Sequence, residues 1–261
     1  MPPPLIELRD VHRRFDALVV LNGVSLSIQP GQSIVIIGAS GSGKSVLLKH
    51  MVGLLRPDRG QVFFDGQRID HLPERKLMRI RRRFGFLFQL GALFDSLSVA
   101  QNIAFPLLEH SSQSAAQVRQ TVARKLALVG LDGFEDKMPG ELSGGQRKRV
   151  ALARAIAMDP EVILYDEPTT GLDPIRADVI NSLIVRLKRE LGMASVVVTH
   201  DMNSAFRVAD RVVMLHDGRF IFDGTPAQVQ QSTDPVVRRF VAGEADEREL
   251  AAIRAPAANG R

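Results

Sequence analysis

The residues Gly38-Ala39-Ser40-Gly41-Ser42-Gly43-Lys44-Ser45 decide the fold of this chain. They form a complete G-x-x-x-x-G-K-S pattern, which follows the apolar run Ser33–Ile37 and precedes an apolar stretch that begins at Val46. A buried strand, a glycine-rich turn and a helix in this order bind phosphate, because backbone N–H groups converge at the helix N-terminus. Lys44 adds a positive charge, and the Ser45 hydroxyl can ligate Mg²⁺. The stretch therefore predicts a nucleotide-binding α/β domain.

A second stretch, Val162-Ile163-Leu164-Tyr165-Asp166-Glu167, has the pattern of a buried strand that ends in two carboxylates. Ligands of α/β sheets bind at the carboxyl ends of the strands, so we expect these side chains near the phosphate-binding turn. Asp166 suits coordination of Mg²⁺, and Glu167 suits orientation and deprotonation of an attacking water. Alone, such an acidic strand end is usually the start of a loop. Combined with the phosphate-binding turn, it indicates nucleotide hydrolysis.

The rest of the chain alternates short apolar runs with amphipathic ones, as expected of an α/β protein. Phe84–Phe88 and Ser195–Thr199 are predicted to be further central strands, and Ile175–Leu191 is predicted to be a helix. Short N-terminal strands and two hairpin turns are also expected. These segments are Leu5–Val11, Ser25–Ile28, Asp65-Gly66 and Asp217-Gly218. An antiparallel layer is therefore predicted to flank a mostly parallel core.

Residues 90–158 differ from the rest, because Gln113–Val129 and Gly144–Met158 have helical patterns with no strand signal between them. The chain is predicted to be one domain with three parts. These are a core with an antiparallel β subdomain (1–89 and 159–233), an inserted helical subdomain (90–158), and a C-terminal helix and tail (234–261). In the last part we expect a short helix over Val236–Val241 and disorder at the end of the chain.

A third motif, Leu142-Ser143-Gly144-Gly145-Gln146, precedes a helical pattern that begins at Arg147. Ser143 is a good N-cap residue, which is the plain structural interpretation. Two glycines after an N-cap weaken a helix start by roughly 1 kcal/mol each, but they leave bare N–H groups that can bind a second phosphate. Two phosphate sites in different parts of one chain indicate a composite site that is shared between subunits.

The composition narrows the classes of partner. The chain has a formal charge of +5 but no Trp and one Tyr, so it has few aromatic residues for stacking nucleic-acid bases. We therefore expect no nucleic-acid partner, and we interpret Arg79-Ile80-Arg81-Arg82-Arg83 as a solvated helix face. The absence of Cys excludes disulfides and thiolate metal sites. No segment has the pattern of a membrane-spanning helix or a signal peptide.

These motifs together resemble the nucleotide-binding subunits of ABC transporters, over about Ile6 to Phe240. Gly38–Ser45 is similar to the family's Walker A motif, Val162–Glu167 to Walker B and Leu142–Gln146 to the signature. The resemblance implies a P-loop NTPase (RecA-like) core with an N-terminal antiparallel β subdomain and an inserted α-helical subdomain. It also implies an enzyme that hydrolyses ATP with Mg²⁺ as cofactor.

The resemblance assigns further residues to the ATP site. Gln89 falls at the family's Q-loop, Gly171-Leu172-Asp173-Pro174 is similar to the D-loop, and His200 resembles the switch histidine. Phe15 would stack on adenine, where the family more often has Tyr. The implied catalytic residues are Lys44, Gln89, Glu167 and His200, and the implied Mg²⁺ ligands are Ser45, Gln89 and Asp166. The implied ATP-binding residues are Phe15, residues 38–46 including Val46, Asp173, and Ser143, Gly144, Gly145 and Gln146 from the second copy of a head-to-tail homodimer.

A narrower resemblance lies in Lys44-Ser45-Val46-Leu47-Leu48-Lys49, in the segment after Gln89 and in Asp234–Phe240. These stretches are similar to the ATPases of the Mla (maintenance of lipid asymmetry) and Mce (mammalian cell entry) lipid-transport systems. The resemblance implies a subunit that powers transport of phospholipid between the inner and the outer membrane. It would lie peripherally on the cytoplasmic face of the bacterial inner membrane, with an integral membrane permease and a periplasmic lipid-binding subunit of the Mce type as partners.

The apolar cluster Gly91–Phe94, directly after Gln89, has two interpretations. It can belong to the core of the helical subdomain, or it can line a groove for a cytoplasmic helix of the membrane partner. The sequence leaves both open.

Other function classes fit less well. Soluble ABC ATPases of translation or DNA repair resemble tandem-domain or coiled-coil-inserted proteins, whereas this chain has one domain and no long heptad insert. A regulator that binds nucleotide without hydrolysis is disfavoured because Glu167 and His200 are both present. An ABC transporter for another substrate stays open, since the substrate touches other subunits.

Overall fold

The computed structural model describes residues 3–245 of the chain. Its larger sheet has six strands in the order β10-β9-β3-β8-β7-β6. They are β3 (Ser33–Ile37), β6 (Phe84–Leu87), β7 (Val162–Asp166), β8 (Ala194–Thr199), β9 (Arg211–His216) and β10 (Arg219–Gly224). All pair in parallel except β10, which runs antiparallel to β9. Every residue of β3 and β8 is buried, because helices or the second sheet cover both faces. The predicted central strands are confirmed.

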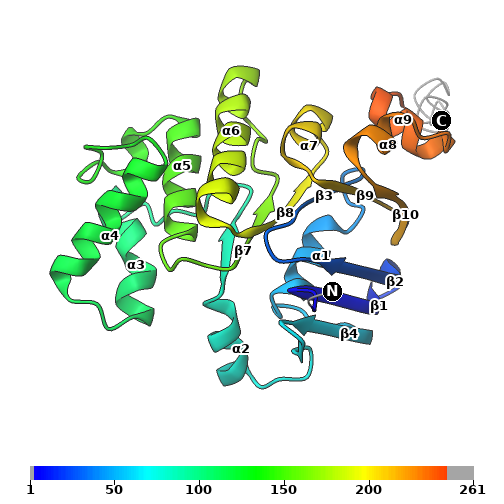
Figure 1. Ribbon diagram of the computed structural model, residues 1–261, viewed down its shortest axis with the longest axis horizontal. Helices are drawn as coiled ribbons and strands as arrows, with labels where there is room; N and C mark the ends of the chain where they lie inside the picture. Colours follow the sequence, from blue (N-terminus) through cyan, green and yellow to red (C-terminus); the bar gives the residue numbers. More distant parts are fainter. Residues whose placement is uncertain (1–2, 246–261) are drawn as a thin grey trace, which may run out of the picture.

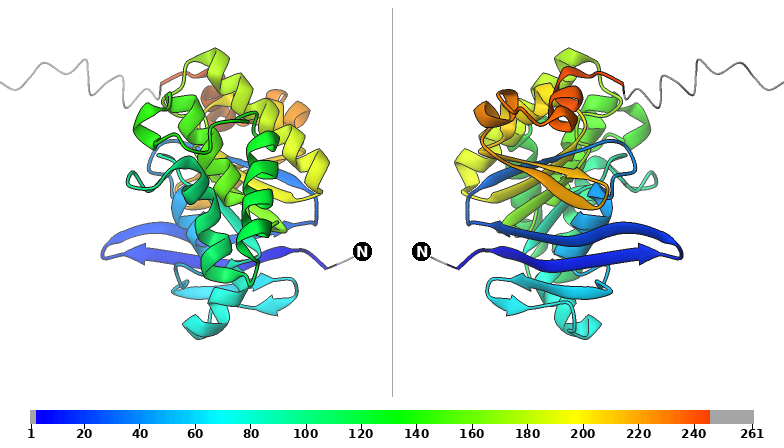
Figure 2. Two further views of the ribbon diagram at one scale, coloured as in Figure 1. Left: turned by 90° about the vertical axis from the view of Figure 1, so that its left-hand side faces the viewer. Right: turned by 90° about the vertical axis from the view of Figure 1, so that its right-hand side faces the viewer.

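The second sheet is antiparallel, with the strand order β2-β1-β4-β5. Its strands are β1 (Ile6–Phe15), β2 (Leu18–Ile28), β4 (Arg59–Phe64) and β5 (Gln67–Arg68). The predicted lengths of the two N-terminal strands are wrong, since β1 and β2 form a long hairpin (Figure 2). Register shifts between Leu8 and His12 break the two-residue alternation, which hides the continuation of β1 in the sequence pattern. The full length of β1 carries Phe15 to the phosphate-binding turn.

The six-stranded sheet separates two apolar cores. Val35 and Ile37 of β3 face the core formed with α5 (Gly144–Ala155), α6 (Pro174–Leu191) and α7 (Met202–Val208). Ile34 and Ile36 face the core formed with α1 (Lys44–Met51) and the antiparallel sheet. Figure 1 shows α6 and α7 above the sheet and α1 on the side of β1 and β2. This alternation within one strand is the reason β3 has no polar face.

The chain between β6 and β7 is helical where it is regular. It forms α3 (Val99–His110), α4 (Ala115–Leu128), a 3₁₀ turn (Pro139–Glu141) and α5. Figure 1 shows α3, α4 and α5 together, at the end of the molecule away from β1 and β4. Each of these helices begins with a Ser N-cap and a Gln three residues later in a capping box, at Ser98, Ser114 and Ser143. Helix α3 is not among the helices that we predicted, and Pro106 in its interior weakens the helix signal. The subdomain boundaries stay a prediction.

Three further helices complete the described residues: α2 (Glu74–Arg81), α8 (Pro226–Gln230) and α9 (Pro235–Ala242). The last one confirms the helix predicted over Val236–Val241. Both predicted hairpin turns are present, with positive φ at Asp65-Gly66 and Asp217-Gly218. The disordered tail that we predicted lies outside the described residues. Within residues 3–245, no helix is long and apolar enough to cross a bilayer.

Candidate active site

The phosphate-binding turn joins the end of β3 to the start of α1. Gly38 and Gly43 have φ of 154° and 100°, which L side chains rarely adopt. A Cβ atom at Gly38 would lie 2.3 Å from the Leu215 carbonyl oxygen, and one at Gly43 would lie 2.8 Å from Val20 Cγ1. Only glycine therefore fits at both positions. No side chain caps the N-terminus of α1, so its first N–H groups remain available to an anion.

Lys44, the first residue of α1, is buried and points back over the turn. Its Nζ donates to the carbonyl oxygens of Gly38 and Ala39 at 2.8 and 2.9 Å. Burial lowers the pKa of Lys44 below its ordinary value, and the nearby carboxylates of Glu167 and Asp166 oppose the shift. A buried ammonium group whose hydrogen-bond partners are carbonyls is electrostatically incomplete. A phosphate in the turn would supply the missing negative charge.

Asp166 ends β7 beside the first turn of α1. Its Oδ1 accepts a hydrogen bond of 2.9 Å from Ser45 Oγ. Burial raises the pKa of Asp166; the Ser45 hydroxyl opposes that shift and the charge of Glu167 adds to it. A cation bound here would stabilise the ionised carboxylate. A hydroxyl and a carboxylate are ligands of the kind that bind Mg²⁺ together with phosphate oxygens. Residues 3–245 contain no cluster of three or more His, Asp or Glu that could hold a metal alone.

Glu167 follows β7 and has a left-handed backbone, with φ of 49°. This conformation is unfavourable for a residue that is not glycine, and it turns the side chain towards the end of β8. Glu167 Oε1 lies 2.9 Å from His200 Nδ1 and 4.0 Å from Lys44 Nζ. Glu167 Oε2 accepts from the hydroxyls of Thr170 and Thr199 at 3.1 and 3.4 Å. The carboxylate is 12% exposed, so it is held firmly and still reaches the cavity.

One cavity of about 320 Å³ brings most of the predicted residues together. Its lining residues are Phe15, Val20, Ser40, Gly41, Gly43, Lys44, Ser45, Val46, Gln89, Glu167 and His200. The reason is the strand order: the segments after β3, β8, β7 and β6 carry these groups, and the four strands are consecutive neighbours. Parallel strands end at one edge of the sheet, so groups distant in sequence meet there. Phe15 comes to this edge from β1 instead.

The third motif lies outside this cavity. Ser143 caps α5 because its hydroxyl oxygen accepts from the Gln146 N–H. The Gln146 side-chain oxygen in turn accepts from the Ser143 N–H. A Cβ atom on Gly145 would meet Arg176 of α6 at 3.6 Å, so the start of α5 lies beside the start of α6. Asp173 caps α6 and pairs with Arg176. Within one copy, these residues do not join Lys44 and Glu167.

Sequence reasoning missed several residues of the site. Val20 lines the cavity, and Thr170 and Thr199 hold the Glu167 carboxylate. Thr170 lies three residues after Glu167, and Thr199 directly precedes His200. This closeness to predicted residues could have identified both threonines from the sequence. Lys148 of α5, which is 7% exposed, donates to the carbonyl oxygens of Gln89 and Glu167. Nothing in the sequence distinguishes Lys148 from the arginines beside it.

The sequence profile of the family described as ABC transporter matches residues 21–170, which include the phosphate-binding turn, the signature and β7. The chain belongs to the ABC transporter family. The ATP-binding cassette MJ0796, in a dimeric post-hydrolysis state bound to ADP and Pi, has a similar structure with a TM-score of 0.78. It is 34% identical, and the match covers 85% of this chain and 98% of that one. The mixed α/β, P-loop fold class is thereby confirmed.

Two curated relatives cover nearly the whole of this ABC ATPase. The intermembrane phospholipid transport system ATP-binding protein MlaF of Haemophilus influenzae is 44% identical over 93% of this chain and 92% of its own length. The "Probable ribonucleotide transport ATP-binding protein mkl" of Mycobacterium bovis is 43% identical over 91% of this chain and 66% of that protein. The predicted resemblance to Mla-type ATPases is confirmed. The chain is an ATPase. The cavity described above is lined by Phe15 and most of residues 38–46, whereas Asp173 and the Ser143–Gln146 motif are not part of its lining.

Proposed function

We propose that this chain is the ATP-hydrolysing subunit of a transporter that moves phospholipid between the inner and the outer membrane. The observation that carries the proposal is the 44% identity to MlaF over almost the full length of both chains. An alignment of that extent includes the nucleotide site and also the surfaces that surround it. The residues around Gln89 that resemble Mla-type ATPases lie on such a surface, next to an open groove.

The chemistry that we propose is transfer of the γ-phosphoryl group of ATP to water. The N–H groups of residues 39–45 and the Lys44 ammonium bind the phosphates. Glu167 accepts the proton of the attacking water. His200, whose Nδ1 lies 2.9 Å from Glu167 Oε1, contacts the γ-phosphate when nucleotide is bound. Phe15, 39% exposed at the mouth of the cavity, stacks on the base. Gln89 also lines the cavity and senses the γ-phosphate.

Mg²⁺ is the cofactor that these residues fit. Ser45, Asp166 and Gln89 would hold it together with oxygens of the β- and γ-phosphates. The ion would neutralise charge that develops on the phosphoryl oxygens. The raised pKa of Asp166, which follows from its burial, supports this assignment because a cation there would offset the cost of burying the carboxylate.

A complete ATP site requires two copies of the chain. The Ser143–Gln146 motif presents a helix N-terminus outside the cavity of its own copy, as described above. We propose that it binds the γ-phosphate held by Lys44 of a second copy in a head-to-tail homodimer. Ser143, Gly144, Gly145 and Gln146 would then act in trans, and Asp173 would lie at the dimer contact. The dimeric ADP and Pi-bound state named for the similar cassette MJ0796 supports this arrangement.

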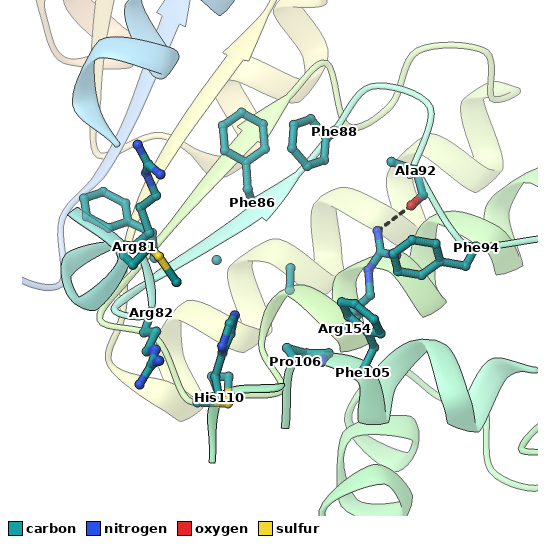
Figure 3. A pocket seen from close by; sticks show the side chains of 15 residues that line it. Arg81, Arg82, Phe86, Phe88, Ala92, Phe94, Phe105, Pro106, His110 and Arg154 are labelled. Atoms are coloured by element: carbon teal, nitrogen blue, oxygen red, sulfur yellow. Dashed lines mark hydrogen bonds between the residues drawn. The ribbon is translucent and has the colours of Figure 1, made fainter. Parts of the chain in front are cut away.

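The partner surface that we propose is a groove of about 460 Å³ next to Gln89. Figure 3 shows Phe86, Phe88, Phe94 and Phe105 around it, with Arg154 between the aromatic rings. Leu90 is 92% exposed and Phe94 is 42% exposed, so the cluster after Gln89 forms an apolar surface, while Leu93 alone packs against the core. An apolar groove with arginines on its rim fits an amphipathic helix that carries a carboxylate. We assign it to a cytoplasmic helix of the integral membrane permease.

The wider assembly follows from the same relatives. The chain would bind peripherally at the cytoplasmic face of the bacterial inner membrane, through the permease. A periplasmic lipid-binding subunit of the Mce type would complete the transporter. The lipid would contact those subunits and not this one, which is why the test must use the whole complex.

The experiment is purification of tagged protein from the native membrane, followed by identification of bound proteins and lipids. We expect a permease and phospholipid to co-purify. Phe94→Asp should weaken capture of the permease at least about tenfold, because docking would bury a carboxylate in place of an apolar ring, and should leave ATP binding near normal. Leu108→Asp is the matched control: Leu108 is 65% exposed on α3 but does not line the groove. A complex that carries nucleotide cargo and no phospholipid would favour the function named for mkl instead.

A further inference from the structure

Lys148 is a buried cation between two loops of the active site. It lies in the second turn of α5, and the side chain is 7% exposed. Its Nζ donates to the Gln89 carbonyl oxygen at 2.9 Å and to the Glu167 carbonyl oxygen at 3.2 Å. Among the described residues, no carboxylate lies within ion-pair distance of this ammonium group. Two backbone carbonyls accept from the ammonium group, and the charge of the nearby Glu167 carboxylate partly offsets the lowering of the Lys148 pKa by burial.

The two carbonyls belong to residues of different function. Glu167 is the proposed base, and its left-handed backbone persists only if the surroundings hold it there. Its N–H donates to the Val198 carbonyl at 3.0 Å, so β8 fixes one side of the residue and Lys148 fixes the other. Gln89 begins the loop that lines the partner groove. A single side chain thus spans the base and the docking loop.

Arg154 gives α5 a second hold on the same loop. It lies less than two turns after Lys148, and its guanidinium donates to the carbonyl oxygens of Gly91 and Ala92 at 3.0 and 2.8 Å. Figure 3 shows the bond to Ala92 on the wall of the groove. Ala92 also has a left-handed backbone, with φ of 50°. Helix α5 therefore fixes the loop at two points, and through Lys148 it also reaches Glu167.

We propose that Lys148 is a positioning residue that couples the docking loop at Gln89 to the carboxylate of Glu167. A shift of α5 or of the loop, caused by a partner or by a second copy at Ser143, moves both carbonyls through one rigid contact. This inference rests on the proposed role of Glu167 as base. It adds a residue on the signature helix of the same copy to the hydrolytic machinery, at a position that does not line the cavity.

The first test is hydrogen exchange by mass spectrometry on the full-length chain with bound ATP. In Lys148→Met, the peptides over residues 88–94 and 166–171 should exchange at least about threefold faster, since both loops lose an anchor. Lys148→Arg should restore most of the protection, because a guanidinium still donates to two carbonyls. Lys125→Met is the control: Lys125 is also buried but pairs with Asp159, away from the site. Faster exchange throughout the chain, or none in either peptide, would overturn the proposal.

The second test separates positioning from folding. Turnover is divided by the amount of labelled ATP bound, so unfolded protein does not count. We expect Lys148→Met to lower this ratio on the order of tenfold with ATP affinity little changed, and Lys125→Met to leave it unchanged. A wild-type ratio in Lys148→Met contradicts the inference. Lys148→Gln, which keeps one amide donor, replaces Lys148→Met if that variant does not fold. Normal hydrolysis by Glu167→Gln would overturn the role of Glu167 as base. The Lys148 variants test positioning, so the two failures are distinguishable.

Discussion

Glu167 shows how much of the site depends on one backbone conformation. The residue has a left-handed φ, and its carboxylate lies between His200 Nδ1 and the hydroxyls of Thr170 and Thr199. An unfavourable φ of this kind persists where surrounding hydrogen bonds fix it. Here they aim one carboxylate oxygen at the cavity and occupy the other. The arrangement suits a general base, because the carboxylate keeps one orientation before the attacking water binds.

The residue-scale prediction is that Glu167→Gln binds ATP but loses most of its turnover. The amide keeps the size of the side chain and one acceptor oxygen, whereas it cannot accept the proton of the attacking water. We expect a loss of at least about 10²-fold in kcat, measured by phosphate release, together with retention of labelled ATP. Glu190→Gln, which breaks the surface ion pair with Arg186, is the control and should hydrolyse at the normal rate. Normal hydrolysis by Glu167→Gln would remove Glu167 from the role of base.

The first turn of helix α5 combines a capping box with two glycines. Its capping box, Ser143 with Gln146, is the same device that begins α3 and α4. The difference lies in Gly144 and Gly145, which follow the N-cap only in α5 and leave its first N–H groups uncovered. The common capping box stabilises the helix, and in the proposed dimer the two glycines would let a phosphate approach its N-terminus.

The element-scale prediction compares two caps. Ser143→Ala and Ser114→Ala should each lower the free energy of unfolding by about 1 kcal/mol, since each removes an N-cap acceptor. Only Ser143→Ala should also reduce ATP turnover, because Ser143 contacts nucleotide in the proposed dimer. Thermal unfolding and phosphate release measured on both variants decide the matter. Equal turnover in the two would leave Ser143 with a capping role alone.

At the scale of the whole molecule, the order of strands in one sheet builds the cavity. The segments that follow β3, β8, β7 and β6 supply the phosphate-binding turn, His200, Glu167 and Gln89 in that spatial order. The signature motif lies at the start of α5, outside this cavity. In the proposed dimer, a monomer therefore contributes two halves of different ATP sites.

The whole-molecule prediction concerns mixed dimers. One copy with Lys44→Ala and one with Ser143→Arg should form one doubly damaged site and one intact site. Purified mixed dimers should then retain hydrolysis, up to roughly half of the wild-type rate if sites act independently, whereas both mutant homodimers lose it. The check is phosphate release from dimers isolated with two different tags. Inactive mixed dimers, together with a Ser143→Arg variant that binds ATP normally, would count against a shared site.

Sequence alone determined the motifs and the strands that carry them, because a glycine-rich turn, an acidic strand end and a continuous apolar run are local patterns. Local patterns also gave the helices α4, α5 and α6, whereas register shifts hid the full length of β1 and Pro106 weakened the signal of α3. The family resemblance assigned Gln89 and His200.

Only the tertiary structure decided which groups meet. It brought Val20, Thr170 and Thr199 to the site, and it exposed Phe94 on a groove. It also placed Lys148 between Gln89 and Glu167, which are 78 residues apart in sequence. The physical reason is that a sequence specifies periodicity and backbone preference over a few residues, whereas contacts between β6, β7 and α5 depend on sheet order and packing. A buried lysine has no local signature, since its function is defined by the carbonyls that it reaches.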